Sequence, residues 1–422
     1  MATLKEITTI ALRAGEIMSE SGSETYRVED TMRRFSRALG SEDSAAYAIP
    51  TGLFLSCEKN THKDVNDIQV VTRMERLSKR STNLGKIAAV NSLSRKVAMQ
   101  SDEVDIEEVE TELERIRNCP DHKALPTIIA TAITAFVFTL MFSGDFKDAC
   151  IAFCVAFLMR SILFLVSLIR LGSFMFAIIG STVISFSTGI LINMGVGMSF
   201  DIINIAALMT LVPGVPIVVA IRDTIAGDYI SGGARATEAF VIALSLSLGA
   251  AAGLLLFPAS RDYNTSMALI DNPIVSFFQA AVISACFAYI FQVKRLSRIF
   301  WTAVAGGFGW MLFIILNNIG FSSMSAFVLG AFCVGLLAEI FAFVLKDPAT
   351  VFVIPALISF VPGGGVYATM YNIILQKQNT AISAFLQTLS IAGAIALGVA
   401  FASGFARFLS GVIIKAKKNR RV

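Results

Sequence analysis

The segment 218–239 combines a dense group of ionisable side chains with glycine and other small residues. Carboxylates beside guanidinium groups can take up and release protons when burial shifts their pKa values, and they can bind charged small molecules. These residue types therefore indicate proton coupling or a charge network. The candidates in this segment are Arg222, Asp223, Asp228, Arg235 and Glu238.

Three charges are expected inside apolar runs. Arg160, Glu238 and Glu339 each lie roughly six residues from the inner end of a run, which places them about 9 Å deep at about 1.5 Å per residue. An unpaired charge costs about 2.5–3.5 kcal/mol at a helix centre, so we expect ion pairs or a water-filled cavity around them. The alternative is that Arg160 extends to the inner surface and that Glu238 caps a helix that starts late.

A Pro-Gly segment occurs twice in the chain. Residues 211–214 read Leu-Val-Pro-Gly and residues 360–363 read Phe-Val-Pro-Gly. A shift of 361 − 212 = 149 residues aligns all later apolar runs without a gap. This pattern predicts an internal repeat, and repeats with broken helices are typical of secondary transporters.

Both copies of the Pro-Gly segment predict a helix that is broken at membrane depth. Proline removes a backbone donor, glycine accepts unusual dihedral angles, and backbone groups freed there must face protein or a polar cavity. A half-helix N-terminus can then bind a carboxylate, whereas the alternative is a simple proline kink that helps packing. The candidate substrate-binding residues are Thr210, Pro213, Gly214, Pro216, Ser359, Pro362, Gly363, Gly364 and Tyr367.

The composition predicts an α-helical polytopic membrane protein preceded by a small α+β cytosolic domain. Hydrophobic residues make up 55% of the chain and the mean hydropathy is +0.70, yet charges are concentrated in the first 125 residues and at the C-terminus. We expect a cytosolic domain at 1–125 and five-helix membrane repeats at 126–258 and 271–415. The ten expected spans are 126–143, 149–166, 173–193, 200–220, 232–257, 273–292, 298–316, 322–345, 348–372 and 379–409.

The loops indicate the orientation. With the N-terminus in the cytosol, the inner loops and tail hold twelve lysines and arginines and the outer loops hold three, in agreement with the positive-inside rule. Five spans per repeat is an odd number, so the two repeats should be inverted. We therefore expect a multi-pass protein of the plasma (inner) membrane with both termini cytoplasmic. The net charge of +4 gives no reason to invoke nucleic acid.

The N-terminal part predicts little chemistry. Helical spacing predicts helices at 4–20, 24–39, 81–100 and 105–117, and β-rich runs at 44–49, 52–57 and 67–73 predict a small antiparallel sheet. The six cysteines are scattered and the two histidines, His62 and His122, lie in this part. We expect no enzyme activity, no cofactor and no metal site, and a regulatory, assembly or vestibule role for this domain.

The motifs around the breaks resemble the threonine/serine exporter family. They are Pro-Gly-Val-Pro at 213–216, Gly-Asp-Tyr-Ile-Ser-Gly-Gly-Ala-Arg at 227–235 and Val-Pro-Gly-Gly-Gly-Val-Tyr at 361–367, with Glu-Thr-Tyr-Arg-Val-Glu at 24–29 near the start. The resemblance covers nearly the whole chain. It implies ten spans and proton-driven export of threonine and serine, and C4-dicarboxylate export in some relatives.

The expected function is export of small hydroxy amino acids by proton antiport. The first repeat holds Arg222, Asp223 and Glu238 where the second holds neutral Tyr371, Asn372 and Gln387, so coupling is expected in the first half. A C4-dicarboxylate exporter is the alternative, and a channel would need a continuous polar stripe along several spans. The expected partners are a small-molecule substrate (an amino acid or organic acid), protons and the lipid bilayer, and a homo-oligomer is compatible with the sequence.

Overall fold

The structure, a computed structural model, describes residues 3–60, 68–77, 81–100, 104–169, 171–197, 199–257, 271–374 and 376–419. Four of the residues that indicate the orientation, Arg170, Arg261, Arg420 and Arg421, lie outside these ranges, as does His62.

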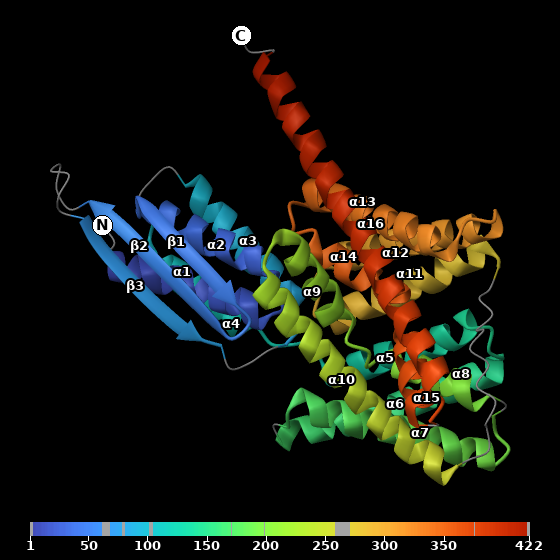
Figure 1. Ribbon diagram of the computed structural model, residues 1–422. Helices are drawn as coiled ribbons and strands as arrows, with labels where there is room; N and C mark the ends of the chain where they lie inside the picture. The colour runs from blue at the N-terminus through green and yellow to red at the C-terminus, as the bar shows by residue number, and fades with distance from the viewer. Residues whose placement is uncertain are drawn as a thin grey trace.

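The N-terminal part is a three-stranded sheet covered by helices (Figure 1). The strands are antiparallel in the order β1–β2–β3, and alternate residues of β2, including Leu53, Leu55 and Cys57, are fully buried. They pack against α1 and α2, whose apolar faces follow the helical spacing. The predicted helices and sheet are therefore confirmed. The elements are α1 (Leu4–Glu20), α2 (Thr25–Ala38), β1 (Asp43–Ile49), β2 (Gly52–Asn60), β3 (Ile68–Arg76), α3 (Leu84–Met99) and α4 (Ile106–Arg117).

The rest of the chain is helical and apolar. Its elements are α5 (Ala124–Met141), α6 (Phe146–Val166), η1 (Ser167–Ile169), α7 (Ser173–Asn193), α8 (Phe200–Leu208), α9 (Gly214–Ala226), α10 (Tyr229–Leu256), α11 (Pro273–Ile290), α12 (Leu296–Asn318), α13 (Ser323–Leu345), α14 (Thr350–Ala356), η2 (Ile358–Phe360), α15 (Gly363–Ile374) and α16 (Gln378–Asn419).

Eight helices of the described chain are long and apolar enough to cross a bilayer. A ninth span results if α14, η2 and α15, which are bent by 48°, are taken together. The expected fourth span, 200–220, is instead two short helices, α8 and α9. Pro213 has no amide hydrogen and stands immediately before α9, so it removes one intrahelical hydrogen bond at the point where α8 and α9 separate.

Corresponding helices of the two halves have corresponding neighbours. In the first half, α8 packs on α5, α6 and α7, and α9 packs on α10; in the second half, α14 packs on α11, α12 and α13, and α15 packs on α16. The two halves meet where α5 contacts α11. The N-terminal part lies beside one end of this bundle, where α2 contacts α9 and α3 contacts α14 (Figure 1).

Candidate functional site

Both Pro-Gly segments interrupt a helix, as expected from proline and glycine. The first break separates α8 from α9, and Pro213 is the N-terminal cap of α9. At the second break, α14 and η2 are followed by α15, which begins at Gly363. The same tight turn closes each break, because Gly214 N donates to Val212 O and Gly363 N donates to Val361 O, both at 2.7 Å.

The two breaks lie against each other. A Cβ built on Gly214 would lie 2.6 Å from Cδ1 of Ile358 in the second break. A Cβ built on Gly363 would overlap Sδ of Met209 in the first break and lie 2.7 Å from Cγ2 of Val212. The contact is reciprocal, because Met209 and Ile358 are equivalent positions of the repeat. Glycine allows this close approach of two broken helices.

A buried polar chain links α7, α8 and α15 beside the breaks. Ser185 Oγ donates to Asn204 Oδ1 at 2.9 Å, and Asn204 Nδ2 donates to Tyr367 Oη at 3.1 Å. Thr188, one turn after Ser185, is fully buried and its hydroxyl has no hydrogen-bond partner among the described residues. A chain of this kind can exchange its internal bonds for bonds to a small polar ligand.

The two hydroxyls expected at the breaks differ in their hydrogen bonding. Thr210 Oγ1 donates to Ala207 O at 2.7 Å, within its own helix turn. Ser359 is buried, and its hydroxyl has no hydrogen-bond partner in the described part of the chain. Ser359 is therefore the better candidate for a ligand contact at the second break.

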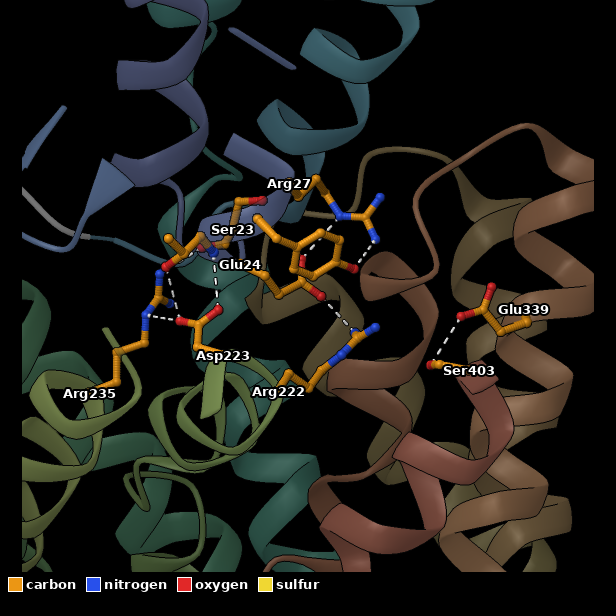
Figure 2. A network of polar contacts seen from close by, with 10 residues as sticks. Ser23, Glu24, Arg27, Arg222, Asp223, Arg235, Glu339 and Ser403 are labelled. Carbon is orange, nitrogen blue, oxygen red and sulfur yellow. Dashed lines mark hydrogen bonds and ion pairs between the residues drawn. The ribbon is translucent and has the colours of Figure 1, made fainter. Parts of the chain in front are cut away.

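A charged cluster joins the N-terminal part to α9 and α10 (Figure 2). Glu24, at the start of α2, is fully buried and its carboxylate lies 2.7 Å from Arg222 Nη1. Arg27 Nε lies 3.1 Å from the other carboxylate oxygen of Glu24. Burial opposes the charge of Glu24, but Arg222 and Arg27 outweigh it and hold the pKa of Glu24 below its ordinary value.

Asp223 is the second carboxylate of this cluster. Its Oδ1 accepts from Thr25 N at 3.0 Å, and its Oδ2 lies 3.0 Å from Arg235 Nε. Arg235 in turn donates to Ser23 O at 2.7 Å, so α9, α10 and the start of α2 are held at one point (Figure 2). Burial raises the pKa of Asp223 to about 6, in spite of Arg235 and the Thr25 amide, which lower it.

A cleft of about 210 Å³ lies between this cluster and the first break. Pro216 of α9 and Ser173 of α7 line it together with Arg235 and Glu238, which are three residues apart on α10. Hydroxyl side chains from the N-terminal part, including Ser19, complete the wall. A guanidinium, a carboxylate and several hydroxyls facing one small cleft suit a zwitterion of small size.

The remaining predicted residues lie elsewhere. Glu339 of α13 accepts from Ser403 of α16 at 3.3 Å (Figure 2), and no ion pair joins it to Arg160 in the described residues. Asp228 is half-buried at the N-terminus of α10, and burial raises its pKa. Within the described residues, no three histidine, cysteine, aspartate or glutamate side chains lie close enough together to hold a metal ion.

Glu24 and Asn204 are not among the predicted site residues. Glu24 lies in the motif at 24–29. The residues around it do not predict its ion pair, because Arg222 is nearly two hundred residues away in the sequence. Asn204 is a lone amide in an apolar run, which is the one signal that sequence offers for it.

The chain matches known families over most of its length. Two family models described as threonine/serine exporters match residues 9–257 and 276–405. Pheromone-regulated membrane protein 10 of Kluyveromyces lactis is 22% identical over 417 residues, 94% of this chain and 42% of that protein. The protein of the same name from Debaryomyces hansenii is 24% identical over 359 residues, 81% of this chain and 34% of that protein. The chain thus spans less than half of these relatives, and no solved structure matches it.

Proposed function

The chain belongs to the threonine/serine exporter family, and we propose that it exports small hydroxy amino acids across the plasma membrane by proton antiport. The observation that carries this proposal is the cleft in which Arg235 and Glu238 face the first helix break. Arg235 would bind the carboxylate of the substrate and Glu238 its ammonium group. The hydroxyl-rich wall suits the side chain of serine or threonine.

The charges of the cleft favour an amino acid over a dicarboxylate. Arg235 is already paired with Asp223, and Glu238 adds a second negative charge. The lining thus offers one cation and one carboxylate, which match the two charges of a zwitterion but not those of a doubly anionic substrate. We therefore place succinate-type export second.

In this proposal, antiport results from competition between a proton and the ammonium group of the substrate for the Glu238 carboxylate. An ionised Glu238 binds the ammonium group, and a proton taken up from the outer side neutralises Glu238 and releases the substrate. One proton thus replaces one substrate at the same carboxylate. A membrane potential supplies about 2.3 kcal/mol per charge for each 100 mV, which is enough to drive export against a concentration ratio of tens.

The repeat supports alternating access. The end of α9 contacts α2 of the N-terminal part, and α14, the counterpart of α8, contacts α3. The N-terminal part thus contacts the second segment of the broken helix, α9, in the first half and the first segment, α14, in the second half, as expected for two inverted repeats with a cytosolic N-terminus. Gly214 approaches Ile358 of the second break, and Gly363 approaches Met209 of the first break. This reciprocal packing gives the two halves a common point about which they can exchange conformations.

Flux measurements in proteoliposomes test the proposal. Purified protein is reconstituted, radiolabelled threonine, serine or succinate is loaded, and efflux is followed with and without a pH gradient. We expect gradient-stimulated efflux of threonine and serine, lost in Glu238→Gln and retained in Glu339→Gln, the matched variant of the other half-buried glutamate of the membrane half. Succinate efflux alone would change the substrate class, and gradient-driven threonine efflux in Glu238→Gln would reject Glu238 as the exchange site.

A further inference from the structure

A second and larger cleft lies between α3 and the start of α12, away from the breaks. Its volume is about 690 Å³, within the size range of small-molecule sites. One wall comes from α3 and α4 of the N-terminal part, and the other is the loop between α11 and α12. The two walls are firmly joined, because Leu84 N donates to Phe291 O at 2.9 Å and a Cβ on Gly85 would overlap Gln292 O.

Positive charge dominates the lining of this cleft. Three of its six cationic side chains have carboxylate partners: Lys96 lies 2.8 Å from Glu108, Arg115 lies 3.3 Å from Glu112, and Arg298 is paired with Asp347. The other three are Lys86, Lys294 and Arg295.

These three cations have no carboxylate within ion-pairing distance among the described residues. Lys86 Nζ donates to Arg117 O at 2.7 Å, and Lys294 Nζ donates to Pro120 O at 2.6 Å, so both ammonium groups keep donor capacity. Arg295 is exposed on the loop. The cleft therefore holds an excess of three positive charges, which a bound anion would neutralise.

The start of α12 adds backbone donors to the same cleft. Arg295 is the N-terminal cap residue of this 23-residue helix, and its side chain does not cap the first amides. Leu296 and Phe300, in the first turns, are 81% and 60% exposed and begin a candidate membrane span. Cations, an uncapped helix N-terminus and exposed apolar side chains thus lie together at the edge of the bilayer.

We propose that this cleft binds a phosphate group, supplied by the headgroup of an anionic phospholipid. Lys294 and Arg295 contact the phosphate together with the first amides of α12, and Lys86 contacts it from α3. The acyl chains lie along Leu296 and Phe300. The bound lipid links the N-terminal part to the membrane half at a place that is separate from the substrate cleft.

Titrations of the full-length protein in detergent test this site. Microscale thermophoresis measures the Kd of a short-chain phosphatidylglycerol, with short-chain phosphatidylcholine as the zwitterionic headgroup and glycerol phosphate as the soluble phosphate ester. Two surface cations are worth about 1 kcal/mol each, so Lys294→Gln/Arg295→Gln should weaken phosphatidylglycerol binding about 30-fold. Lys5→Gln/Arg76→Gln removes two exposed cations of the N-terminal part that do not line the cleft, and it should leave binding unchanged.

The outcomes separate the sources of the phosphate. Glycerol phosphate could bind as tightly as phosphatidylglycerol and lose the same affinity in the double variant. This result would overturn the lipid assignment, because the ligand of the phosphate site would then be a soluble ester. Equal binding of phosphatidylcholine, or unchanged binding in the double variant, overturns the site. Lys294 also donates a hydrogen bond to Pro120 O, so its loss could prevent folding. In that case the single variant Arg295→Gln replaces the double variant in the titration. It should weaken binding about 5-fold, and unchanged binding in a folded single variant overturns the proposal.

Discussion

The carboxylate of Glu24 lies 2.7 Å from Nη1 of Arg222, so the start of α2 and the end of α9 share a buried ion pair. The Arg222 side chain is 9% exposed and that of Glu24 is fully buried. The docking of the N-terminal part on the membrane half therefore depends on this pair more than on the exposed ion pairs of the surface.

Removing one partner of this pair should destabilise the protein strongly. Arg222→Gln leaves the buried Glu24 carboxylate with Arg27 alone, and loss of one partner of a buried pair costs about 3–5 kcal/mol. The double variant Glu24→Gln/Arg222→Gln should lose less than the sum of the two single variants, because it removes both charges of the pair together and leaves only Arg27, whose side chain is 19% exposed, without its carboxylate. Thermal unfolding in detergent measures both effects.

The exposed pair of Arg34 and Asp30 is the control for this experiment. Its atoms are also 2.7 Å apart, but the side chains are 36% and 57% exposed. Arg34→Gln should therefore cost only about 0.3–0.5 kcal/mol. Equal losses for Arg222→Gln and Arg34→Gln would mean that burial of the Glu24 pair has no energetic consequence.

Protonation of Asp223 should make stability depend on pH. Burial raises its pKa from 3.8 to about 6 in the folded protein, with Arg235, Glu24 and Thr25 as its neighbours. A raised pKa means that the folded state binds the proton more tightly than the unfolded state. The contribution of Asp223 to stability is therefore present below about pH 4 and is lost as the pH rises to about 6.

The variant Asp223→Asn tests the sign of this dependence. It keeps the shape of the side chain and cannot ionise, so the fall of the midpoint temperature between about pH 4 and about pH 6 should become smaller than in the wild type. Glu24→Gln is the comparison, because the pKa of Glu24 is lowered and its contribution is lost in the opposite direction, as the pH falls. An unchanged pH profile in Asp223→Asn contradicts the assignment.

The glycines of the two breaks should differ in their tolerance of alanine. A Cβ at Gly363 meets Met209 and the stiff side chain of Val212, whereas a Cβ at Gly214 meets the flexible tip of Ile358. Overpacking of a closely packed site costs about 1–3 kcal/mol, so both variants should lower stability and flux, and Gly363→Ala should lower them more.

Gly364 provides the matched control for the alanine series. A Cβ there would lie 3.8 Å from Ile205 Cγ2, which is ordinary van der Waals contact. Gly364→Ala should therefore leave stability near the wild-type value. Met209→Ala should restore part of the stability of Gly363→Ala, and failure of this rescue would show that the loss does not come from contact between the breaks.

Sequence predicts the local features of this fold well. The alternation in β2, the helical spacing in α1 and α2, and the break at Pro213 depend only on residues close in sequence. The sequence pattern is therefore enough to predict them. Hydropathy did not distinguish one broken span at 200–220 from the two short helices α8 and α9, because both bury the same apolar residues.

The candidate site is less predictable because its partners are distant in the chain. Asp223 and Arg235 are close in sequence and were expected in one network, whereas Glu24 reaches Arg222 only through the docking of a separate part. Depth alone suggested that Glu339 belongs with Glu238. The structure instead places Glu339 beside Ser403 of α16, since residues at one depth can face different helices.

On the proposed export function, the hydroxyl of Tyr367 should contribute to recognition of a hydroxy amino acid, in addition to the hydroxyl-rich wall of the cleft. It accepts from Asn204 Nδ2, which lies in a chain with Ser185 beside the two breaks. A site that hydrogen-bonds a substrate hydroxyl rejects an analogue without it, because its own polar groups are then left unpaired. Valine has nearly the shape of threonine but lacks the hydroxyl, so the wild type should export threonine and exclude valine.

Competition of unlabelled valine against labelled threonine in proteoliposomes measures this preference. Tyr367→Phe removes the hydroxyl that accepts from Asn204, and a hydrogen bond is worth about 0.5–1.5 kcal/mol, so the preference for threonine should fall by up to about 10-fold. Asn204→Leu should lower it further, because it removes the partner of both Ser185 and Tyr367. Stability alone does not separate a binding role from a structural one, whereas the ratio of the two substrates does. If Tyr367→Phe lowers the flux of threonine but leaves this ratio unchanged, the polar chain only holds α7, α8 and α15 together, and recognition of the hydroxyl lies in the cleft of Arg235 and Glu238.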